Sequence, residues 1–203
     1  MRKQVCEYSY KSHLISLVIQ NIYFSARKRF ATSNSDLLTD LRAFEECVKF
    51  QKENNSSSFR KFCEENFISW FTVRDVSSLR QDLFASLVST GFVPSSLKSD
   101  SAALSLHGRR ENLIKSVILG GLWPRIARVE MPKAIFDKIQ AGTIQRDHEA
   151  KEYKVYEKDG GRVFLHPQSI MFGSLGSQKS PYFAYFSKSM TTKLFLRDAT
   201  EVT

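Results

Sequence analysis

The hydrophobic period of this sequence changes near Arg125, and that change constrains the fold more than any other feature. Before it, apolar residues recur every three or four positions, which is the spacing of amphipathic helices. After it, apolar and polar residues alternate in short runs bounded by Gly, Pro or Ser, which is typical of β-strands with tight connections. The sequence therefore predicts an α+β chain, with an N-terminal α-helical bundle followed by a small antiparallel β-barrel.

We predict three regions along the 203 residues, a length sufficient for one or two domains with a buried core. Residues 1–93 form the helical domain, and residues 94–109 are a Ser-rich connection. Residues 110–203 form the barrel together with a leading helix. That helix covers residues 110–121, and its predicted apolar face consists of Leu113, Val117 and Ile118.

The clearest helix of the first region covers residues 34–52. Ser35 or Asn34 can cap it, and Asp36 lies in its first turn, where a carboxylate suits the helix dipole. Leu37, Leu41, Phe44 and Val48 recur at spacings of three and four, so they share one face.

Two further helices are predicted, one from Phe59 to Asn66 and one from about Val73 to Ser89. Gly91 is suited to the C-terminal cap of the last helix. Cys47 and Cys63 fall on neighbouring helices and are expected to be small core residues. The apolar stripe of the third helix consists of Val76, Leu79, Leu83 and Leu87.

The barrel is predicted from five or six short strands. A turn signal, Asp159-Gly160-Gly161, separates two of them. This number of strands suits a partly open barrel of the OB type, whose strands and loops commonly bind oligonucleotides. Residues 132–150 are interpreted as an insertion without a structural assignment.

The chain carries 30 basic and 21 acidic residues, a net charge of +9, which favours a polyanionic partner such as nucleic acid. Many soluble proteins are also basic, so charge alone does not decide this. The three cysteines lack a CxxC pair and predict reduced thiols in a cytoplasmic or nuclear protein. We find no secretory signal and no apolar run long enough for a bilayer, and therefore expect an intracellular chain with no membrane partner.

Catalytic and metal-binding patterns are missing from the sequence. Its four histidines form no HExxH motif, and there is no GxSxG elbow. There is also no GxxxxGK[ST] loop to hold nucleotide phosphates. We therefore predict no catalytic residues, no metal site and no cofactor for this stretch of chain.

Six blocks of the sequence are distinctive when they are taken together. The blocks are Ser35-Asp-Leu-Leu-Thr-Asp-Leu-Arg-Ala-Phe44, Cys63-Glu-Glu-Asn-Phe67, Leu79-Arg-Gln-Asp-Leu83, Asn112-Leu-Ile-Lys-Ser-Val-Ile-Leu-Gly-Gly-Leu-Trp-Pro-Arg-Ile-Ala-Arg128, Arg162-Val-Phe-Leu-His-Pro-Gln-Ser169 and Leu194-Phe-Leu-Arg-Asp-Ala-Thr200. In this order they resemble the helicase-associated region and OB-fold of DEAH/RHA-type RNA helicases. The resemblance covers nearly the whole chain from about Leu14.

The chain departs from this family at two positions, because Leu37 replaces a histidine and Cys47 replaces a tryptophan. We therefore carry over no role from the family for these two positions. The resemblance implies a helical "ratchet" region and an OB-fold without the two RecA-like motor domains. It implies a parent ATP-dependent RNA helicase whose motor domains use ATP and Mg²⁺. Its partners would be single-stranded RNA and the RecA-like domains.

The resemblance places RNA contacts in two parts of the barrel. In the His-Pro-Gln-Ser turn, His166, Gln168 and Ser169 can donate to phosphate or base; alternatively, the turn is structural. Lys188, Thr192 and Lys193 are predicted in a hairpin loop that either contacts phosphate or is merely solvated. Arg74 and Arg80 on the third helix are further candidate RNA contacts, although surface arginines are common.

A second function remains open, that of a protein-docking module. By resemblance, the OB-fold can receive an activator protein or attach the helicase to a ribonucleoprotein particle. The aromatic residues Tyr182, Phe183, Tyr185 and Phe186 fit either function. Alternate members of this set must lie in the core, and the others are free to face a protein or to stack on a base.

Overall fold

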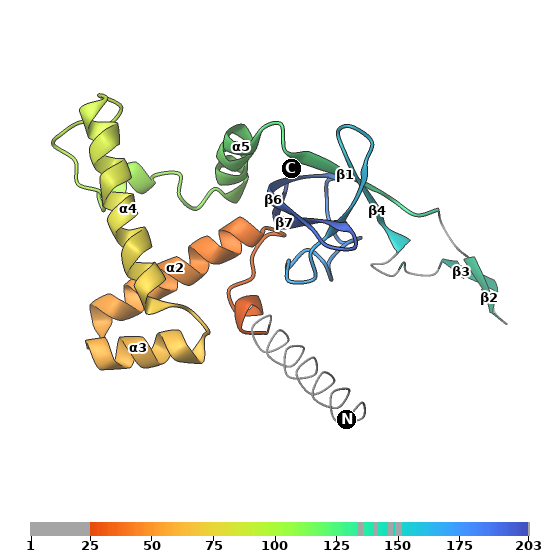
Figure 1. Ribbon diagram of the computed structural model, residues 1–203, viewed down its shortest axis with the longest axis horizontal. Helices are drawn as coiled ribbons and strands as arrows, with labels where there is room; N and C mark the ends of the chain where they lie inside the picture. Colours follow the sequence, from red (N-terminus) through yellow and green to blue (C-terminus); the bar gives the residue numbers. More distant parts are fainter. Residues whose placement is uncertain (1–24, 134–135, 140–141, 146–147, 149–151, 203) are drawn as a thin grey trace, which may run out of the picture. The chain divides into compact units, whose positions relative to one another are not determined.

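The computed structural model describes residues 25–133, 136–139, 142–145, 148 and 152–202 (Figure 1). Its residues divide into two compact units. The helical unit contains the residues up to Phe30 and Asp40–Arg110, and the barrel unit contains Ala31–Thr39 and Glu111–Thr203. The predicted α+β class is confirmed. The first turn of one helix is part of the barrel unit, although it is distant from the strands in sequence.

The helical unit is built on α2 (Asp36–Glu53) from Asp40 onward, α3 (Ser56–Glu65) and α4 (Trp70–Ser89), with a 3-10 turn η1 (Ala102–Ser105). Its small core is aromatic at the edges, and the rings of Phe50 and Phe62 stack with centroids 4.4 Å apart. Cys47 and Cys63 are fully buried, which confirms their predicted place. The buried residues of this core are Cys47, Phe59, Cys63 and Val73.

The C-terminus of α4 ends as the sequence predicts. Gly91 has a φ of +78°, a left-handed conformation that glycine adopts without steric cost. Its amide donates to the Val88 carbonyl and the Phe92 amide donates to the Leu87 carbonyl, both at 3.0 Å. These two bonds form a Schellman motif, which satisfies carbonyls that the helix leaves free.

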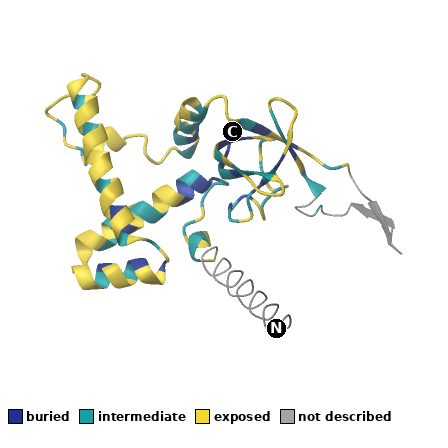
Figure 2. Ribbon diagram, viewed as in Figure 1, coloured by how far each residue is buried: buried dark blue, intermediate teal, exposed yellow. Residues whose placement is uncertain are grey.

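The apolar stripe of α4 is exposed, although the apolar stripe of an amphipathic helix usually faces a core. Figure 2 shows α4 almost entirely as exposed ribbon. Only Val73 of this helix is buried. The stripe residues Val76, Leu79, Leu83 and Leu87 are 40%, 56%, 57% and 46% exposed, respectively. Their helical spacing was predicted, but the unit offers them no core.

Five strands close into a barrel in the order β1-β4-β5-β7-β6 (Figure 1). Four neighbouring pairs are antiparallel, and β5 and β7 are parallel. The prediction of an antiparallel, partly open barrel is therefore corrected to a closed barrel with mixed pairing. The strands are β1 (Ile126–Glu130), β4 (Lys154–Glu157), β5 (Arg162–Leu165), β6 (Tyr182–Met190) and β7 (Leu194–Glu201).

If the barrel strands are numbered one to five along the chain, their order around the barrel is 1-2-3-5-4, with strand four next to strand one. This is the order of an OB barrel. The connection between the first two barrel strands holds a separate two-stranded sheet, formed by β2 (Phe136–Ile139) and β3 (Gly142–Gln145). Residues 132–150, interpreted as an insertion, thus contain two antiparallel strands. Some of the other residues of this segment lie outside the described ones.

The barrel core consists of inward-facing residues that alternate with outward-facing ones. Val129, Val155 and Val163 are buried and lie opposite one another across β1, β4 and β5. Phe183 and Tyr185 are buried while Tyr182 and Phe186 are exposed, which confirms the expected division of those aromatics. The outward positions of the strands are therefore free to form a surface.

The helix α5 (Glu111–Leu122) precedes the barrel and contacts β6. Its predicted apolar face is wrong, because Leu113 and Val117 are exposed and Lys115 is buried instead. The helix also continues through Gly120 and Gly121, where the sequence predicted its end.

Asp36 fastens the first turn of α2 to the barrel. Its carboxylate is fully buried and accepts hydrogen bonds from the amides of Ile170 and Ala199, both at 2.9 Å, and from the Ser169 hydroxyl at 2.6 Å. Beside it, Ser35 contacts the Thr200 hydroxyl at 2.8 Å and accepts from the Leu38 amide, so Ser35 is the predicted helix cap. A buried carboxylate with three donors makes this turn part of the barrel.

Candidate nucleic-acid interface

The outer face of β5 and β7 carries basic and aromatic side chains in matched positions. The parallel register places Phe164 opposite Phe195, with ring centroids 6.0 Å apart. Two residues further along the chain from each phenylalanine, the His166 imidazole lies 2.9 Å from the Arg197 guanidinium. We call this surface of Arg162, Phe164, His166, Lys193, Phe195 and Arg197 the β5–β7 face.

Two cations flank the Phe164 ring. The Lys193 ammonium lies 4.5 Å and the Arg162 guanidinium 5.2 Å from the ring centroid. Lys193 belongs to the tight connection between β6 and β7, in which the Thr191 amide donates to the Lys193 carbonyl. OB-folds commonly bind oligonucleotides on the second and third strands and on the loop before the fifth strand. These are β4, β5 and this connection.

A second row of outward residues crosses four strands. The strand registers place Arg128 of β1 between Tyr182 of β6 and Tyr156 of β4. Tyr156 in turn lies opposite Arg162 of β5. The order along the row is tyrosine, arginine, tyrosine, arginine, and we call these four residues the belt. Because Arg162 belongs to both surfaces, the belt joins the β5–β7 face.

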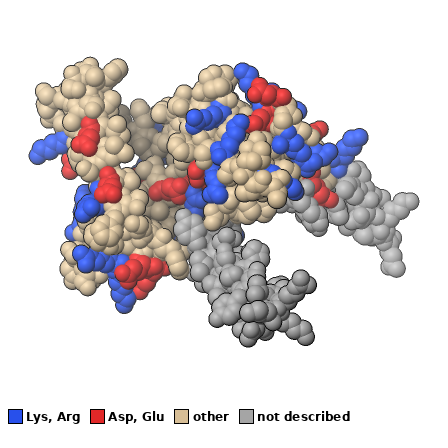
Figure 3. All heavy atoms as spheres, in the orientation of Figure 1, with Lys and Arg blue, Asp and Glu red and all other residues tan. Residues whose placement is uncertain are grey.

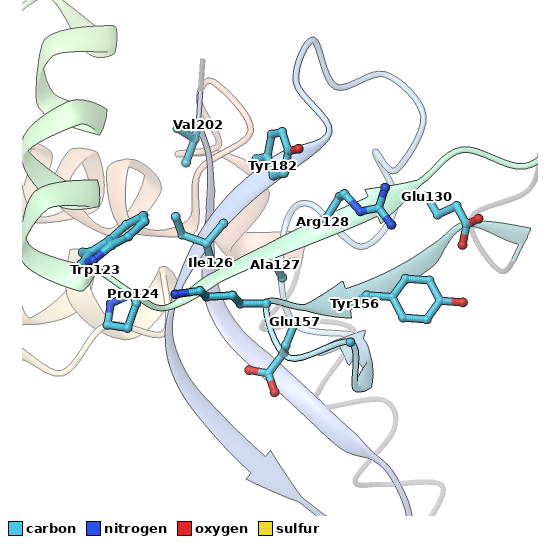
Figure 4. Close-up of a pocket in the computed structure, with 12 residues that line it drawn as sticks. Trp123, Pro124, Ile126, Ala127, Arg128, Glu130, Tyr156, Glu157, Tyr182 and Val202 are labelled. Carbon is cyan, nitrogen blue, oxygen red and sulfur yellow. The ribbon is translucent and has the colours of Figure 1, made fainter.

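Three belt residues, Tyr182, Arg128 and Tyr156, line a pocket of about 710 Å³ on the outer face of β1 (Figure 4). Trp123 and Pro124 lie at the end next to α5, Tyr182 and Val202 border one side, and Arg128 extends along the strand. Trp123 is 64% exposed, and the Lys158 ammonium lies 5.8 Å from its ring centroid. A smaller cleft of about 380 Å³ borders the β5–β7 face and includes Arg162, Phe164 and Lys193.

The family comparison agrees with the barrel topology. Residues 114–203 match the model of the oligonucleotide/oligosaccharide-binding (OB)-fold family. A candidate DEAH-box ATP-dependent helicase of Mycosarcoma maydis is 40% identical over 190 residues, which is 87% of this chain and 12% of that protein. The chain is homologous to DEAH-box helicases.

Other helicases align over a similar stretch. The human ATP-dependent DNA/RNA helicase DHX36 is 28% identical over 93% of this chain, which is 17% of the human protein. A mouse protein, the candidate ATP-dependent RNA helicase DHX57, is 28% identical over 85% of this chain and 14% of its own length. The chain therefore spans 12–17% of the length of these helicases.

His166 and Lys193 lie together on the β5–β7 face of this OB-fold, but His166 is engaged in internal contacts. Its Nδ1 atom accepts from the Gln168 amide at 3.2 Å, and its ring packs edge-on against Phe195. Burial and the Arg197 charge lower the pKa of His166 below its ordinary value of 6.5. The imidazole is thus neutral near pH 7 and helps to hold the turn in place.

Ser169 is a correction to the predicted RNA contacts. Its side chain is only 2% exposed, and its hydroxyl donates to Asp36. It therefore offers no surface to a strand of RNA. Gln168 is half-buried, and its backbone amide is used by His166.

Lys188 is also placed differently from the prediction. It lies within β6, opposite Leu196, and not in the hairpin connection. Its ammonium contacts the Glu157 carboxylate at 2.6 Å, while the Tyr185 hydroxyl donates to the same carboxylate. Thr192, in contrast, is exposed in the connection as expected.

The two basic candidates of the helical unit, Arg74 and Arg80, lie beside aromatic and apolar residues of the same unit. Arg74 lies over the rings of Trp70 and Phe71, at 5.9 and 5.6 Å from their centroids. Arg80 borders a groove with Phe44 and Val48. Their role in RNA binding stays a prediction.

The sequence did not single out Phe164, Phe195, Tyr156 or Arg128 as surface residues of the OB-fold. All four lie in strands, where an isolated run does not show which face is covered. The alternation Arg162-Val163-Phe164-Leu165-His166 was the available signal, because its odd-numbered positions Val163 and Leu165 would be interpreted as buried and the others as outward.

Among the described residues, no group of three or more His, Cys, Asp or Glu side chains could hold a metal ion. A search of the same residues found no helix with the length and apolar character needed to cross a membrane.

The pKa of His166 predicts how the stability of this OB-fold depends on pH. Because the pKa is lowered in the folded state, the unfolded chain takes up the proton first as pH falls. The contribution of neutral His166 to the free energy of unfolding is therefore fully present well above pH 6.5, and it declines as pH falls through that value. We expect the melting temperature to fall from pH 7.5 to about pH 6, and His166→Gln to remove most of that decline.

His107→Gln is the control for this measurement. His107 is exposed and lies in the helical unit, so its substitution is expected to leave the profile unchanged. Melting curves by circular dichroism in buffers of equal ionic strength make the comparison. An unchanged profile in the His166 variant would assign the pH dependence to other groups.

Proposed function

We propose that this chain is an RNA-binding accessory region of an ATP-dependent RNA helicase, which guides a single RNA strand over motor domains elsewhere in the parent protein. The observation that carries the proposal is the belt with its adjoining β5–β7 face. There, basic and aromatic side chains alternate across four neighbouring strands and end at paired phenylalanines.

The chemistry of this surface suits a flexible, anionic strand with exposed bases. Aromatic rings stack on any base, and cations neutralise the phosphates between them. Neighbouring strands are about 4.8 Å apart, so a four-strand belt extends over roughly 14 Å of surface. In the view of Figure 3, Lys and Arg side chains are prominent on the visible face of the barrel unit. A rigid barrel thus holds the side chains in place before the strand arrives.

ATP hydrolysis belongs, in this proposal, to the motor domains of the parent. The 203-residue sequence has no GxxxxGK[ST] motif, and the helicases to which it is homologous are much longer. We propose further that the parent works inside the cell and that the helical unit packs against its motor domains.

Removing two cations of the β5–β7 face tests RNA binding. We expect Arg162→Ala with Lys193→Ala to weaken binding of a 12-nucleotide oligouridine about tenfold at low salt. The dependence of log K on log salt concentration should become shallower by about 1.4, because each lost phosphate contact on a single strand removes about 0.7. Fluorescence anisotropy at a series of NaCl concentrations measures both quantities.

The matched control is Lys49→Ala with Lys61→Ala, which removes the same charge from exposed positions of the helical unit. It should change affinity much less than the barrel variant. Equal losses in the two variants would mean that only net charge matters, and absence of binding by the unaltered chain at low salt would refute the RNA-binding function.

A second candidate function is a protein-docking module, and the exposed stripe of α4 favours it. Four aliphatic side chains on one helix face are 40–57% exposed. Such a face suits a protein surface and not an RNA backbone. The partner could be an activator protein or a ribonucleoprotein component. Polar substitutions on this stripe would weaken docking without changing RNA affinity, which separates the two functions.

A further inference from the structure

The pocket around Trp123 adds Trp123 and Lys158 to three belt residues that also line it, Tyr182, Arg128 and Tyr156. Trp123 is 64% exposed, and tryptophan is enriched at interfaces because its ring offers a large apolar surface together with a polar N–H group. Tyr182, which is about half exposed, borders the same pocket. Its volume of about 710 Å³ falls within the usual range for small-molecule sites.

The charges around the pocket favour an anionic ligand with an aromatic group. Lys158 places its ammonium 5.8 Å from the Trp123 centroid, and Arg128 extends along the pocket (Figure 4). Two carboxylates also line it. Glu157 points away from Trp123 in Figure 4 and is paired with Lys188, whereas Glu130 is at the far end. The Trp123 end is therefore the basic and aromatic one.

The hairpin between β4 and β5 supports this arrangement of Lys158. The Gly160 amide donates to the Glu157 carbonyl and the Glu157 amide donates to the Gly161 carbonyl, each at 3.0 Å. Gly160 has a φ of +80°, which a residue with a side chain rarely adopts. The tight turn holds Lys158 at the rim of the pocket on a short, defined loop.

We propose that this pocket is a base-binding subsite that receives one unpaired base of the RNA strand crossing the belt. The base stacks on Trp123, and Lys158 neutralises the phosphate of the same nucleotide. The strand would then run from the β5–β7 face across Arg162 into the pocket, whose lining includes Tyr156 and Arg128, because the strand registers place these three residues side by side. This subsite rests on the RNA-binding function proposed above.

Tryptophan labelling provides a direct test on the full chain. The chain has two tryptophans, Trp70 in the helical unit and Trp123 in the barrel unit, so 5-fluorotryptophan labelling gives two ¹⁹F resonances. Trp123→Phe assigns them. On titration with the 12-nucleotide oligouridine, the Trp123 resonance is expected to shift with the same midpoint as the anisotropy.

Two variants complete the test. Trp123→Leu should weaken binding about tenfold, the effect of losing one stacked base, and Lys158→Ala should weaken it several-fold. Phe92→Leu, at an exposed aromatic position of the helical unit, should change nothing. If RNA binds but the Trp123 resonance does not move and Trp123→Leu binds normally, the subsite is refuted while the RNA-binding function stands.

The remaining outcome concerns the proposed function itself. If the unaltered chain does not change the anisotropy of the oligonucleotide at low salt, the RNA-binding function is refuted and the subsite falls with it. A Trp123 resonance that then shifts only on addition of a purified protein partner would identify the pocket as a docking site.

Discussion

Replacing Asp36 with alanine is expected to lower the free energy of unfolding by about 3–5 kcal/mol, the largest stability effect we foresee for a single residue. The fully buried carboxylate accepts from two amides and one hydroxyl, and each buried donor left without an acceptor costs about 1–3 kcal/mol. Because domains of this size are stable by about 5–15 kcal/mol, the loss removes a large part of the total.

Thermal melting of the full chain measures this effect. A loss of that size lowers the melting temperature by roughly 15 °C or more for a domain of about 100 residues. Asp36→Asn keeps one acceptor oxygen and should fall between the alanine variant and the unaltered chain. Hydrogen exchange at Ile170 and Ala199 gives a local readout, since both amides should lose protection.

Asp40→Ala is the matched control, because it removes the same charge from the same helix one turn later. Asp40 is 54% exposed and accepts two bonds, of 2.9 and 3.1 Å, from the Arg27 guanidinium, and because water screens the exposed carboxylate we expect its loss to cost about 1 kcal/mol. If the Asp36 and Asp40 variants melt together, the hydrogen bonds to Asp36 do not stabilise the barrel as we infer.

Removing the two aromatic rings of the β5–β7 face should have the largest effect on RNA binding. We expect Phe164→Leu with Phe195→Leu to weaken oligouridine binding by a factor of about 10 to 100, since a stacked base contributes about 1–3 kcal/mol. Leucine keeps an apolar side chain at each half-buried position, so the change removes stacking while preserving most packing. Fluorescence anisotropy at one fixed, low salt concentration measures the loss.

Phe186→Leu serves as the comparison, because Phe186 is an exposed aromatic of the same barrel that lies outside the belt and the β5–β7 face. Its affinity should match that of the unaltered chain. Melting curves must show that the double variant is folded. Unchanged affinity in a folded double variant would exclude base stacking on these rings.

The local features of the fold were predictable from the sequence. Gly91 and Gly160 occupy turns whose backbone only glycine adopts easily, and the neighbouring residues determine those turns. Ser35 as a cap and Cys47 and Cys63 as core residues also follow from local rules of spacing and size. Each of these depends on residues within a few positions along the chain.

Features that depend on distant pairing were not predictable. The parallel pairing of β5 with β7, and the registers of β1 with β4 and β6, join residues that are tens of positions apart. The partner of Asp36 lies more than 130 positions away. Likewise, Leu79 and Leu83 have the spacing of a buried face, but only the tertiary structure shows that this unit leaves the face exposed.

The candidate site was partly predictable for the same reason. Lys193 and Thr192 were located because a short polar segment between two strands is recognisable as a loop. The prediction for Ser169 is wrong, because the sequence of a turn does not show that a carboxylate from another part of the chain accepts a hydrogen bond from its hydroxyl. Arg128 and Tyr156 become neighbours only through the strand register.

The attachment of Asp36 to the barrel has an evolutionary consequence. The barrel is not one continuous stretch of sequence, because one of its buried acceptors is encoded before the main part of the helical unit. Gene rearrangement that moved the strands alone would leave three donors unpaired in the transplanted protein. A gene segment that encodes a fully hydrogen-bonded barrel must therefore carry Ala31–Thr39 as well as the strands, and with them the part of the helical unit encoded in between.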